Sequence, residues 1–286
     1  MNSVIDIGIF ELLLSFLILI LPVAFLYYYK IRIIKSILIS VVRMVLQLSL
    51  VAVYLEWVFE LNSPWVNTLW VLIMIFVGVF TTIQRAYLNW KSFVFPLFIS
   101  GLTSIVIIDA FFLGLIIRLD YVFDAQYFIP ITGMVLGNAL NHNIIGLRVY
   151  FKDLYEKSGL YQFLLTNTGN NMKLTLRPFL SEAIKQSLNP LIANISVMGL
   201  ISLPGMMTGQ LLGGSSPAIA IKYQILIVVA ILAGCTINLF LSIMISNRFV
   251  FDEYQNLKAE KVFPNKKLPK QSKKEGSKSK NNKNGA

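Results

Sequence analysis

Long, nearly uncharged apolar stretches constrain this chain more than any other feature. Hydrophobic residues make up 56% of its 286 residues and charged residues only 14%, with a mean hydropathy of +0.69, whereas about a quarter of the residues in a soluble domain are charged. A helix needs about 20 apolar residues to cross the roughly 30 Å hydrocarbon core of a bilayer. The sequence therefore predicts an all-α integral membrane protein and excludes a soluble globular one. Seven stretches have the required length, near residues 9–29, 36–58, 65–83, 93–117, 127–147, 189–212 and 219–245.

The positions of lysine and arginine predict the orientation of these seven helices, because cytoplasmic loops carry the excess of positive charge. With the N-terminus outside, 22 of the 25 Lys and Arg residues lie in cytoplasmic segments. Only Arg118 and Lys222 then lie outside, and Arg43 falls within a span. We therefore expect about seven transmembrane helices in a multi-pass protein of the plasma membrane, with the N-terminus outside and the C-terminus in the cytoplasm.

Two segments are predicted to lie outside the bilayer. The longer connection, about residues 148–187, alternates apolar and polar residues before a turn at Gly169, which indicates short amphipathic helices. It is either a loop on the membrane surface or a docking surface for a cytoplasmic partner. The chain thus divides into a membrane domain, residues 1–257, and a Lys-rich cytoplasmic tail, residues 258–286, predicted to be disordered. Because the excess positive charge is concentrated in this tail, we expect no nucleic-acid partner.

Several kinds of chemistry are excluded by residue counts. A single cysteine, Cys235, excludes a disulfide framework and a Cys-based zinc cluster, and a single histidine, His142, excludes an HExxH site. The chain contains no GxxxxGK[ST] motif, so it holds no ATP in a P-loop and carries no cofactor of its own. No nucleophile and base pair suggests an intramembrane enzyme. ATP-driven transport would therefore need another polypeptide.

Polar residues inside the predicted spans are candidates for a substrate path, since a polar group in lipid is costly unless it faces a partner or water. Arg43 and Gln47 belong to a polar stripe on the second span, where Arg43 either reaches the cytoplasmic surface or pairs within the bundle. Asp109, in the fourth span, is either a path residue or a carboxylate that reaches water.

The fifth span carries a second group of candidates. Gly133 and Gly137 form a GxxxG motif that permits close helix approach. His142 is either a hydrogen-bonded residue between helices or a metal ligand. The polar and thioether candidates on one side of this helix are Met134, Asn138, Asn141 and His142.

The sixth span ends in a run of glycine, proline and methionine residues. Pro204 removes a helical hydrogen bond, so we expect a kink or break there. The methionines either pack or offer thioether ligands to soft cations. The candidates for packing or hinge roles are Pro204, Gly205, Gly209 and Gly213, and those for the path are Met198, Met206, Met207 and Gln210.

Three patterns in the sequence resemble one known family. Residues 204–210 read PGMMTGQ and are followed by Gly213-Gly214, Pro217 and KYQ at 222–224; residues 130–139 read PITGMVLGNA; and Arg43 with Gln47 gives RxxxQ. Together these motifs resemble the FetB-type ABC transporter permeases, an iron-export family that is similar to plant aluminium-tolerance permeases. The resemblance covers about residues 9–257.

The resemblance implies that residues 1–257 form a permease domain that works with a separate cytoplasmic ABC ATPase, which would bind ATP and Mg²⁺. It also implies metal-ion export, with iron as the substrate. For the ATPase contact it points to Phe163, Leu164 and Gly169, although this region lacks the glutamate and alanines of a usual coupling segment. Because the chain is short for two pseudo-symmetric halves, we expect a homodimer. The alternative is an ion-coupled secondary transporter or cation channel that uses Asp109 and His142 without an ATPase.

These observations lead to a hypothesis for the path. The path has a binding position near its inner side, at His142 and Asn138, and an outer exit lined by Met206 and Met207. Movement at the break between Pro204 and Gly205 would operate it. In this hypothesis Met206, Met207 and His142 are the metal ligands.

Overall fold

The structure is a computed structural model, and it describes residues 7–119 and 121–264. Within these residues the chain is built from helices, with no strand beyond two isolated bridges. The elements are α1 (Ile9–Ser15), η1 (Phe16–Leu19), α2 (Ile20–Tyr28), α3 (Ile34–Leu61), α4 (Pro64–Ala86), α5 (Trp90–Asp109), η2 (Ala110–Ile117), α6 (Ala125–Glu156), α7 (Ser158–Asn167), α8 (Met172–Val197), α9 (Gly205–Leu212), α10 (Pro217–Val250) and α11 (Ala259–Val262).

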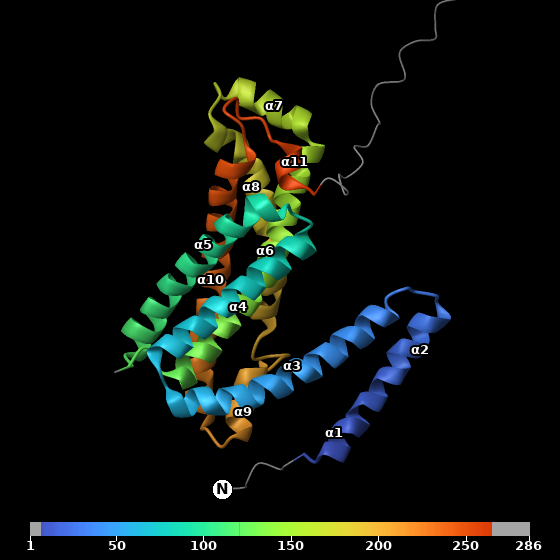
Figure 1. Cartoon of the computed structure of the whole chain (residues 1–286), viewed down its shortest axis with the longest axis vertical. Coiled ribbons are helices and arrows are strands. Elements are labelled where there is room, and N and C mark those ends of the chain that lie inside the picture. Colours follow the sequence, from blue (N-terminus) through green and yellow to red (C-terminus); the bar gives the residue numbers. More distant parts are fainter. Residues whose placement is uncertain (1–6, 120, 265–286) are drawn as a thin grey trace, which may run out of the picture.

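Helices α4, α5, α6, α8 and α10 form one bundle (Figure 1). Helix α10 packs on α5 and α6, α4 packs on α6 and α5, and α8 packs on α6. The 32 residues of α6 and the 34 of α10 make helices about 48 and 51 Å long at a rise of about 1.5 Å per residue. Both helices are thus longer than a bilayer core of roughly 30 Å. They project at the end of the bundle that carries α7 and α11, called here the α7 end; the opposite end, with α9, is the α9 end.

Five helical segments are long and apolar enough to cross a membrane: Ile9–Tyr28, Ile34–Leu61, Pro64–Ala86, Trp90–Ile117 and Pro217–Val250. The predicted fifth span lies within α6, whose ends extend beyond it. The predicted sixth span, residues 189–212, contains the break expected at Pro204, but the interruption begins several residues earlier than that proline. Helix α8 ends at Val197, and α9 starts only at Gly205. Gly199, with a φ of +84°, and Pro204 both prevent a continuous helix here, because neither fits the helical backbone pattern.

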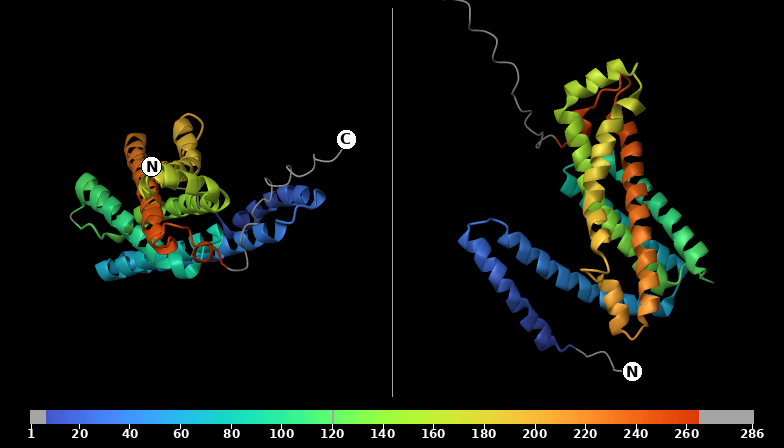
Figure 2. Two further views of the ribbon diagram at one scale, coloured as in Figure 1. Left: turned by 90° about the horizontal axis from the view of Figure 1, so that it is seen from above. Right: turned by 180° about the vertical axis from the view of Figure 1, so that it is seen from behind.

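Helices α1, η1 and α2 and the longer first part of α3 form an N-terminal arm, residues 9–53, that projects from the bundle (Figure 2). None of its residues is buried, and α3 joins the bundle only through its last turns, where Val58 is fully buried and Tyr54 stacks on Trp70 with ring centroids 4.1 Å apart. An apolar groove of about 710 Å³ separates α2 from α3. Such an apolar surface belongs in a bilayer or against another chain.

The packed structure continues beyond residue 257, so the predicted start of a disordered tail at residue 258 is wrong. Asn89 donates its backbone N–H to Val262 O at 2.8 Å and its side-chain amide to Glu260 O at 2.9 Å. Val262 is fully buried and Phe263 is 6% exposed. These two apolar side chains hold α11 against α5, whereas the rest of the predicted tail, residues 265–286, lies outside the described residues.

Two truncations test this boundary. Ending the chain after Pro264 is expected to leave folding and transport nearly unchanged, because the removed Lys-rich residues offer few apolar groups to a core. Ending it after Leu257 removes the buried side chains of Val262 and Phe263. This is expected to lower the free energy of unfolding by roughly 3–6 kcal/mol, since each buried apolar side chain contributes about 1.5–3 kcal/mol. Thermal unfolding in detergent measures both. Equal stability of the two variants would contradict the assignment of α11 to the core.

Candidate functional site

Helix α7 lies across one end of the bundle as a platform between α6 and α8 (Figures 1 and 2). On its inner face Tyr161 is buried and donates its hydroxyl to Gln255 O at 2.7 Å. Burial, helped by the charge of Asp252, raises the pKa of Tyr161 to about 12, so the hydroxyl stays protonated as a donor at neutral pH. On its outer face Leu160 and Phe163 are 49% and 64% exposed. The platform therefore presents an apolar patch that its own fold does not cover.

The predicted coupling residues occupy different positions on this platform. Phe163 is exposed, whereas Leu164 is half-buried and packs against the core. Gly169 and Asn170 have φ values of +63° and +60° and make the turn that leads into α8. The structure thus separates an outward-facing residue, Phe163, from two with structural roles.

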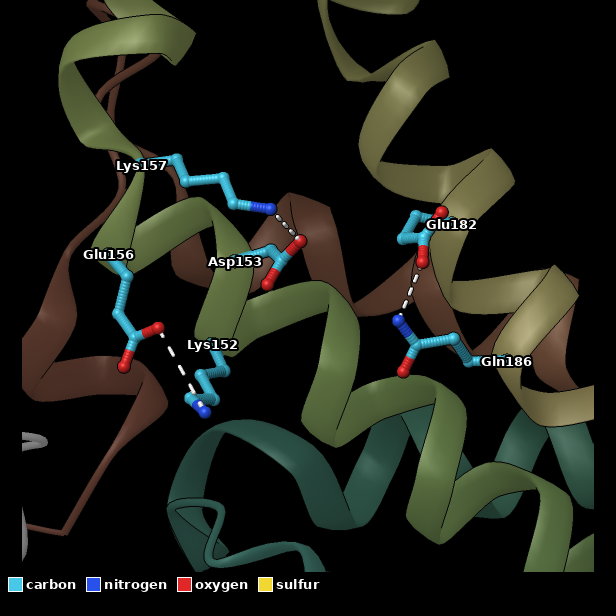
Figure 3. A network of polar contacts seen from close by, with 6 residues as sticks. All are labelled: Lys152, Asp153, Glu156, Lys157, Glu182 and Gln186. Atoms are coloured by element: carbon cyan, nitrogen blue, oxygen red, sulfur yellow. Dashed lines mark hydrogen bonds and ion pairs between the residues drawn. The ribbon is translucent and has the colours of Figure 1, made fainter.

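Charged residues lie at the end of α6 and on α8, the two helices that α7 joins (Figure 3). Lys157 pairs with Asp153 at 2.6 Å, Lys152 lies 3.9 Å from Glu156, and on α8 the amide of Gln186 donates to Glu182 at 2.6 Å. Exposed ion pairs of this kind stabilise a fold by only about 0.3–0.5 kcal/mol each. Their importance is that they mark this part of α6 and α8 as a surface suited to water rather than to lipid.

Asp109 is buried at the end of α5, where its carboxylate accepts a hydrogen bond from Thr132 on α6 at 2.7 Å. Its second oxygen, Oδ1, has no partner in the described structure. The π-helical segment η2 begins at the next residue, and π-helical turns are often found at functional sites. Asp109 is therefore a polar group held between α5 and α6 with unused hydrogen-bonding capacity.

His142 links α6 to α8. Its Nδ1 lies 2.6 Å from Ser187 O, and the Ser187 hydroxyl donates to His142 O at 2.8 Å. Because a carbonyl oxygen only accepts, Nδ1 is the donor in this contact. This geometry matches the interpretation of His142 as a residue hydrogen-bonded between helices. Among residues 7–119 and 121–264, no group of three or more His, Cys, Asp or Glu side chains could hold a metal ion.

The other predicted residues of α6 are not brought together with His142 on a buried surface. Asn141 and Gly137 are exposed, Met134 and Asn138 are half-buried, and the Asn138 amide donates to the backbone oxygen of Met134 at 2.8 Å. They form an open face of α6. On the N-terminal arm, Arg43 and Gln47 are both exposed.

The interruption between α8 and α9 contains the sixth-span candidates. Met198 and Met206 are half-buried, and Met207 is 9% exposed. Gln210, on α9, is half-buried, and its Oε1 has no partner in the described structure.

A buried polar cluster was not predicted. Asn143 on α6 donates to Asn238 Oδ1 at 3.0 Å and to the Ser242 hydroxyl at 3.3 Å, both on α10. Its own Oδ1 is buried without a partner. The two asparagines line a cavity of about 30 Å³, which has room for about one water molecule. The spacing of Asn238 and Ser242 by four residues in an apolar stretch was the available signal.

The glycines with close neighbours differ from those predicted. A Cβ at Gly137, Gly205 or Gly209 would have no neighbour within 4 Å, and one at Gly213 would meet only backbone oxygens of α9 itself, the nearest at 3.2 Å. These four glycines therefore do not pack closely against another helix among the residues that the structure describes. Gly133 has a close neighbour, since its Cβ would lie 3.0 Å from Met74 Cε.

Comparison with known proteins identifies the family of this chain. Residues 9–251 match UPF0014, described as "Uncharacterised protein family (UPF0014)". The chain is a member of UPF0014. No solved structure matches it.

Three relatives of this chain carry informative names. "Probable iron export permease protein FetB" of Escherichia coli is 27% identical over 234 residues, which are 80% of this chain and 86% of that protein. "Protein ALUMINUM SENSITIVE 3" of Arabidopsis thaliana is 32% identical over 201 residues, covering 70% and 71%. "UPF0014 membrane protein YjkA" of Bacillus subtilis is 28% identical over 225 residues, covering 78% and 88%. The resemblance found in the sequence motifs is thus confirmed, and this UPF0014 chain belongs to a family of membrane permeases.

Proposed function

We propose that this UPF0014 chain is the membrane permease subunit of an ABC transporter that exports metal ions, with iron as the substrate, and that a separate cytoplasmic ATPase binds ATP and Mg²⁺. The observation that carries the proposal is the α7 platform. It joins α6 to α8 at the α7 end of the bundle and offers the exposed apolar pair Leu160 and Phe163 close to charged residues at the end of α6. An apolar patch with a charged rim is typical of a docking site.

The arrangement of the helices supports seven crossings with the α7 end in the cytoplasm. The crossings are α1–α2, α3, α4, α5–η2, α6, α8–α9 and α10. Lys152 in the last turns of α6, Lys157 directly after α6 and Arg248 in the last turn of α10 belong to the helix ends at the α7 end, in agreement with an inward excess of positive charge. This arrangement leaves the N-terminus outside and the C-terminus inside the plasma membrane.

Transport in sealed vesicles tests the proposal. Vesicles that contain the chain and its co-purified ATPase are expected to accumulate ferrous iron only when ATP is supplied. Asp109, with its unused oxygen Oδ1, favours the alternative of an ion-coupled transporter or cation channel that needs no ATPase. Iron movement driven by a proton or sodium gradient, equally fast with and without ATP, would support that alternative and reject the ABC permease.

Topology is tested by labelling single cysteines. In a Cys235→Ala background, an Ala218→Cys variant is expected to react with a membrane-impermeant thiol reagent in intact cells, because Ala218 lies at the α9 end. An Asn167→Cys variant at the end of α7 is expected to react only after permeabilisation. Labelling of the Asn167→Cys variant from outside would reject the orientation.

A further inference from the structure

Three basic side chains gather at the turn between α2 and α3 without an acidic partner. Lys30, Arg32 and Lys35 are exposed, and they make no ion pair among the residues that the structure describes. The acidic residues between positions 7 and 61 lie in the first turn of α1 and near the far end of α3, at Glu11, Glu56 and Glu60. At a rise of about 1.5 Å per residue, Glu56 is about 32 Å from Lys35 along α3. The turn therefore carries a local positive charge that the chain itself does not neutralise.

The backbone at this turn adds hydrogen-bond donors to the positive charge. Helix α3 starts at Ile34 with no side-chain cap. The backbone N–H groups of Ile34, Lys35 and Ser36 donate no described hydrogen bond, whereas that of Ile37 donates to Ile33 O at 3.0 Å. Free N–H groups at the start of a long helix favour an anion such as phosphate. The turn thus offers both positive charge and donors to a phosphate group.

A cavity at the turn joins the apolar groove between α2 and α3. The cavity has a volume of about 800 Å³, and the three basic residues line it together with Tyr28. The groove, of about 710 Å³, is lined by aliphatic and aromatic side chains whose only polar group is the hydroxyl of Tyr27. Ala24, Tyr27 and Ile34 line both spaces, so the two are continuous. Each volume falls in the range of about 300–1,000 Å³ that is typical of small-molecule sites.

The order of these features along the arm matches the depth profile of a bilayer. The segments Ile9–Tyr28 and Ile34–Leu61 are both long and apolar enough to cross a membrane, so the groove between them belongs among acyl chains. Tyr27, Tyr28 and Tyr29 at the end of α2 are 78%, 78% and 68% exposed, and tyrosine is enriched at the membrane–water interface. The basic turn directly follows these tyrosines, at the level of the lipid headgroups.

We propose that the N-terminal arm binds one anionic phospholipid, whose phosphate group lies among Lys30, Arg32 and Lys35 and whose acyl chain lies in the groove between α2 and α3. Charge complementarity selects this occupant, because a phospholipid carries its anionic headgroup directly above an apolar chain. Basic pockets between transmembrane helices bind the headgroups of anionic lipids in this way. Helices α2 and α3 diverge from their turn (Figure 2), and no residue of the arm is buried. The acyl chain therefore supplies packing that the arm lacks.

Native mass spectrometry of the whole chain in detergent tests the headgroup site, with phosphatidylglycerol and phosphatidylcholine of identical acyl chains as probes. The unmodified chain is expected to bind phosphatidylglycerol more tightly. The paired variant Arg32→Gln/Lys35→Gln is expected to lower the affinity for phosphatidylglycerol by roughly 25-fold, because each basic residue near a membrane surface contributes about fivefold. Its affinity for phosphatidylcholine is expected to stay unchanged.

The paired variant Arg85→Gln/Lys91→Gln is the matched control for net charge. It removes two positive charges from exposed residues at the end of α4 and the start of α5, which line neither the cavity nor the groove. It is expected to keep the affinity for phosphatidylglycerol. Equal affinity of the unmodified chain for the two lipids, or an equal loss in both paired variants, would overturn the proposal. Binding of neither lipid would show that protein covers the groove, and would overturn it as well.

A second pair of variants tests the acyl-chain groove. Ala24 lines both spaces, whereas Phe25, 63% exposed on the same helix, lines neither. Ala24→Trp fills the junction and is expected to lower the affinity for both lipids about tenfold, whereas Phe25→Trp is expected to leave it unchanged. Full affinity in Ala24→Trp would overturn the placement of the acyl chain. Thermal unfolding of every variant is measured first, so that a folding defect is recognised.

Glycerol phosphate is the last probe, because it carries the headgroup charge without an acyl chain. It is expected to compete with phosphatidylglycerol only weakly. Displacement of the lipid by a comparable concentration of glycerol phosphate would indicate a site for free phosphate compounds and would overturn the lipid site. These measurements involve neither iron nor ATP nor the ATPase, so their failure would leave the proposed permease function standing.

Discussion

Replacement of Phe163 with aspartate is expected to abolish ATP-driven transport while the folded permease remains in the membrane. Phe163 is 64% exposed on α7, so its side chain contributes little to the fold. An aromatic anchor commonly contributes about 2 kcal/mol or more to an interface, which corresponds to roughly a thirtyfold loss of affinity. ATPase co-purification and iron transport in vesicles measure the effect.

Three further variants make the Phe163 result specific. Phe163→Leu keeps an apolar side chain and is expected to retain most of the coupling. Tyr254→Asp changes a residue that is 82% exposed near the platform and is expected to have little effect. Leu164→Ser is expected to destabilise the protein, because Leu164 packs against the core. Full coupling of ATP hydrolysis to transport in the Phe163→Asp variant would show that the ATPase contact does not depend on Phe163 of α7.

The helices that cross the bundle with uniformly apolar sequences were predictable nearly to their ends. The predicted spans 65–83 and 219–245 correspond to α4 and α10. They were predictable because segments of such apolar composition must be buried in protein or surrounded by lipid. The ends of α6 and α8 were less predictable. Hydropathy falls where a helix leaves the lipid, although the helix itself continues in water through an amphipathic pattern.

The interruption after Val197 illustrates a second limit. An average over about 20 residues is insensitive to a short unwound segment whose residues, such as Leu200 and Ile201, are as apolar as a helix. Pro204 indicated the end of the interruption, and Gly199 was its only signal at the start. A positive φ is a property of the backbone, and glycine permits it without requiring it.

The sequence predicted which polar side chains belong to the candidate site, but it did not predict which residues they contact. The position of His142 on a polar side of its helix was apparent, but its partner Ser187 lies 45 residues away on another helix. Asn143, Asn238 and Ser242 were missed because each is an isolated polar residue in an apolar stretch. Only the packing of α6 on α10 brings them together.

The prediction from glycine spacing was similarly incomplete. A GxxxG pattern predicts that the glycines share a face of the helix, but it does not predict which neighbour that face contacts. The glycines at the tightest helix contacts, Gly146 and Gly234, belong to no predicted motif. A Cβ at Gly146 would lie 2.6 Å from Leu239 Cδ1, and one at Gly234 would lie 2.5 Å from Val135 Cγ1. The neighbour of Gly234 is the less adaptable of the two, because the branched side chain of valine has few rotamers.

Replacement of Gly234 with valine is therefore expected to destabilise the bundle by about 3 kcal/mol, near the upper end of the range for overpacked cores. The added methyl groups must separate α10 from α6 at Val135 and also approach Ile108 on α5. Thermal unfolding of the purified protein in detergent measures the change. Gly209→Val is the matched control, since a Cβ there has no neighbour within 4 Å, and equal loss of stability in both variants would contradict the packing of α10 on α6.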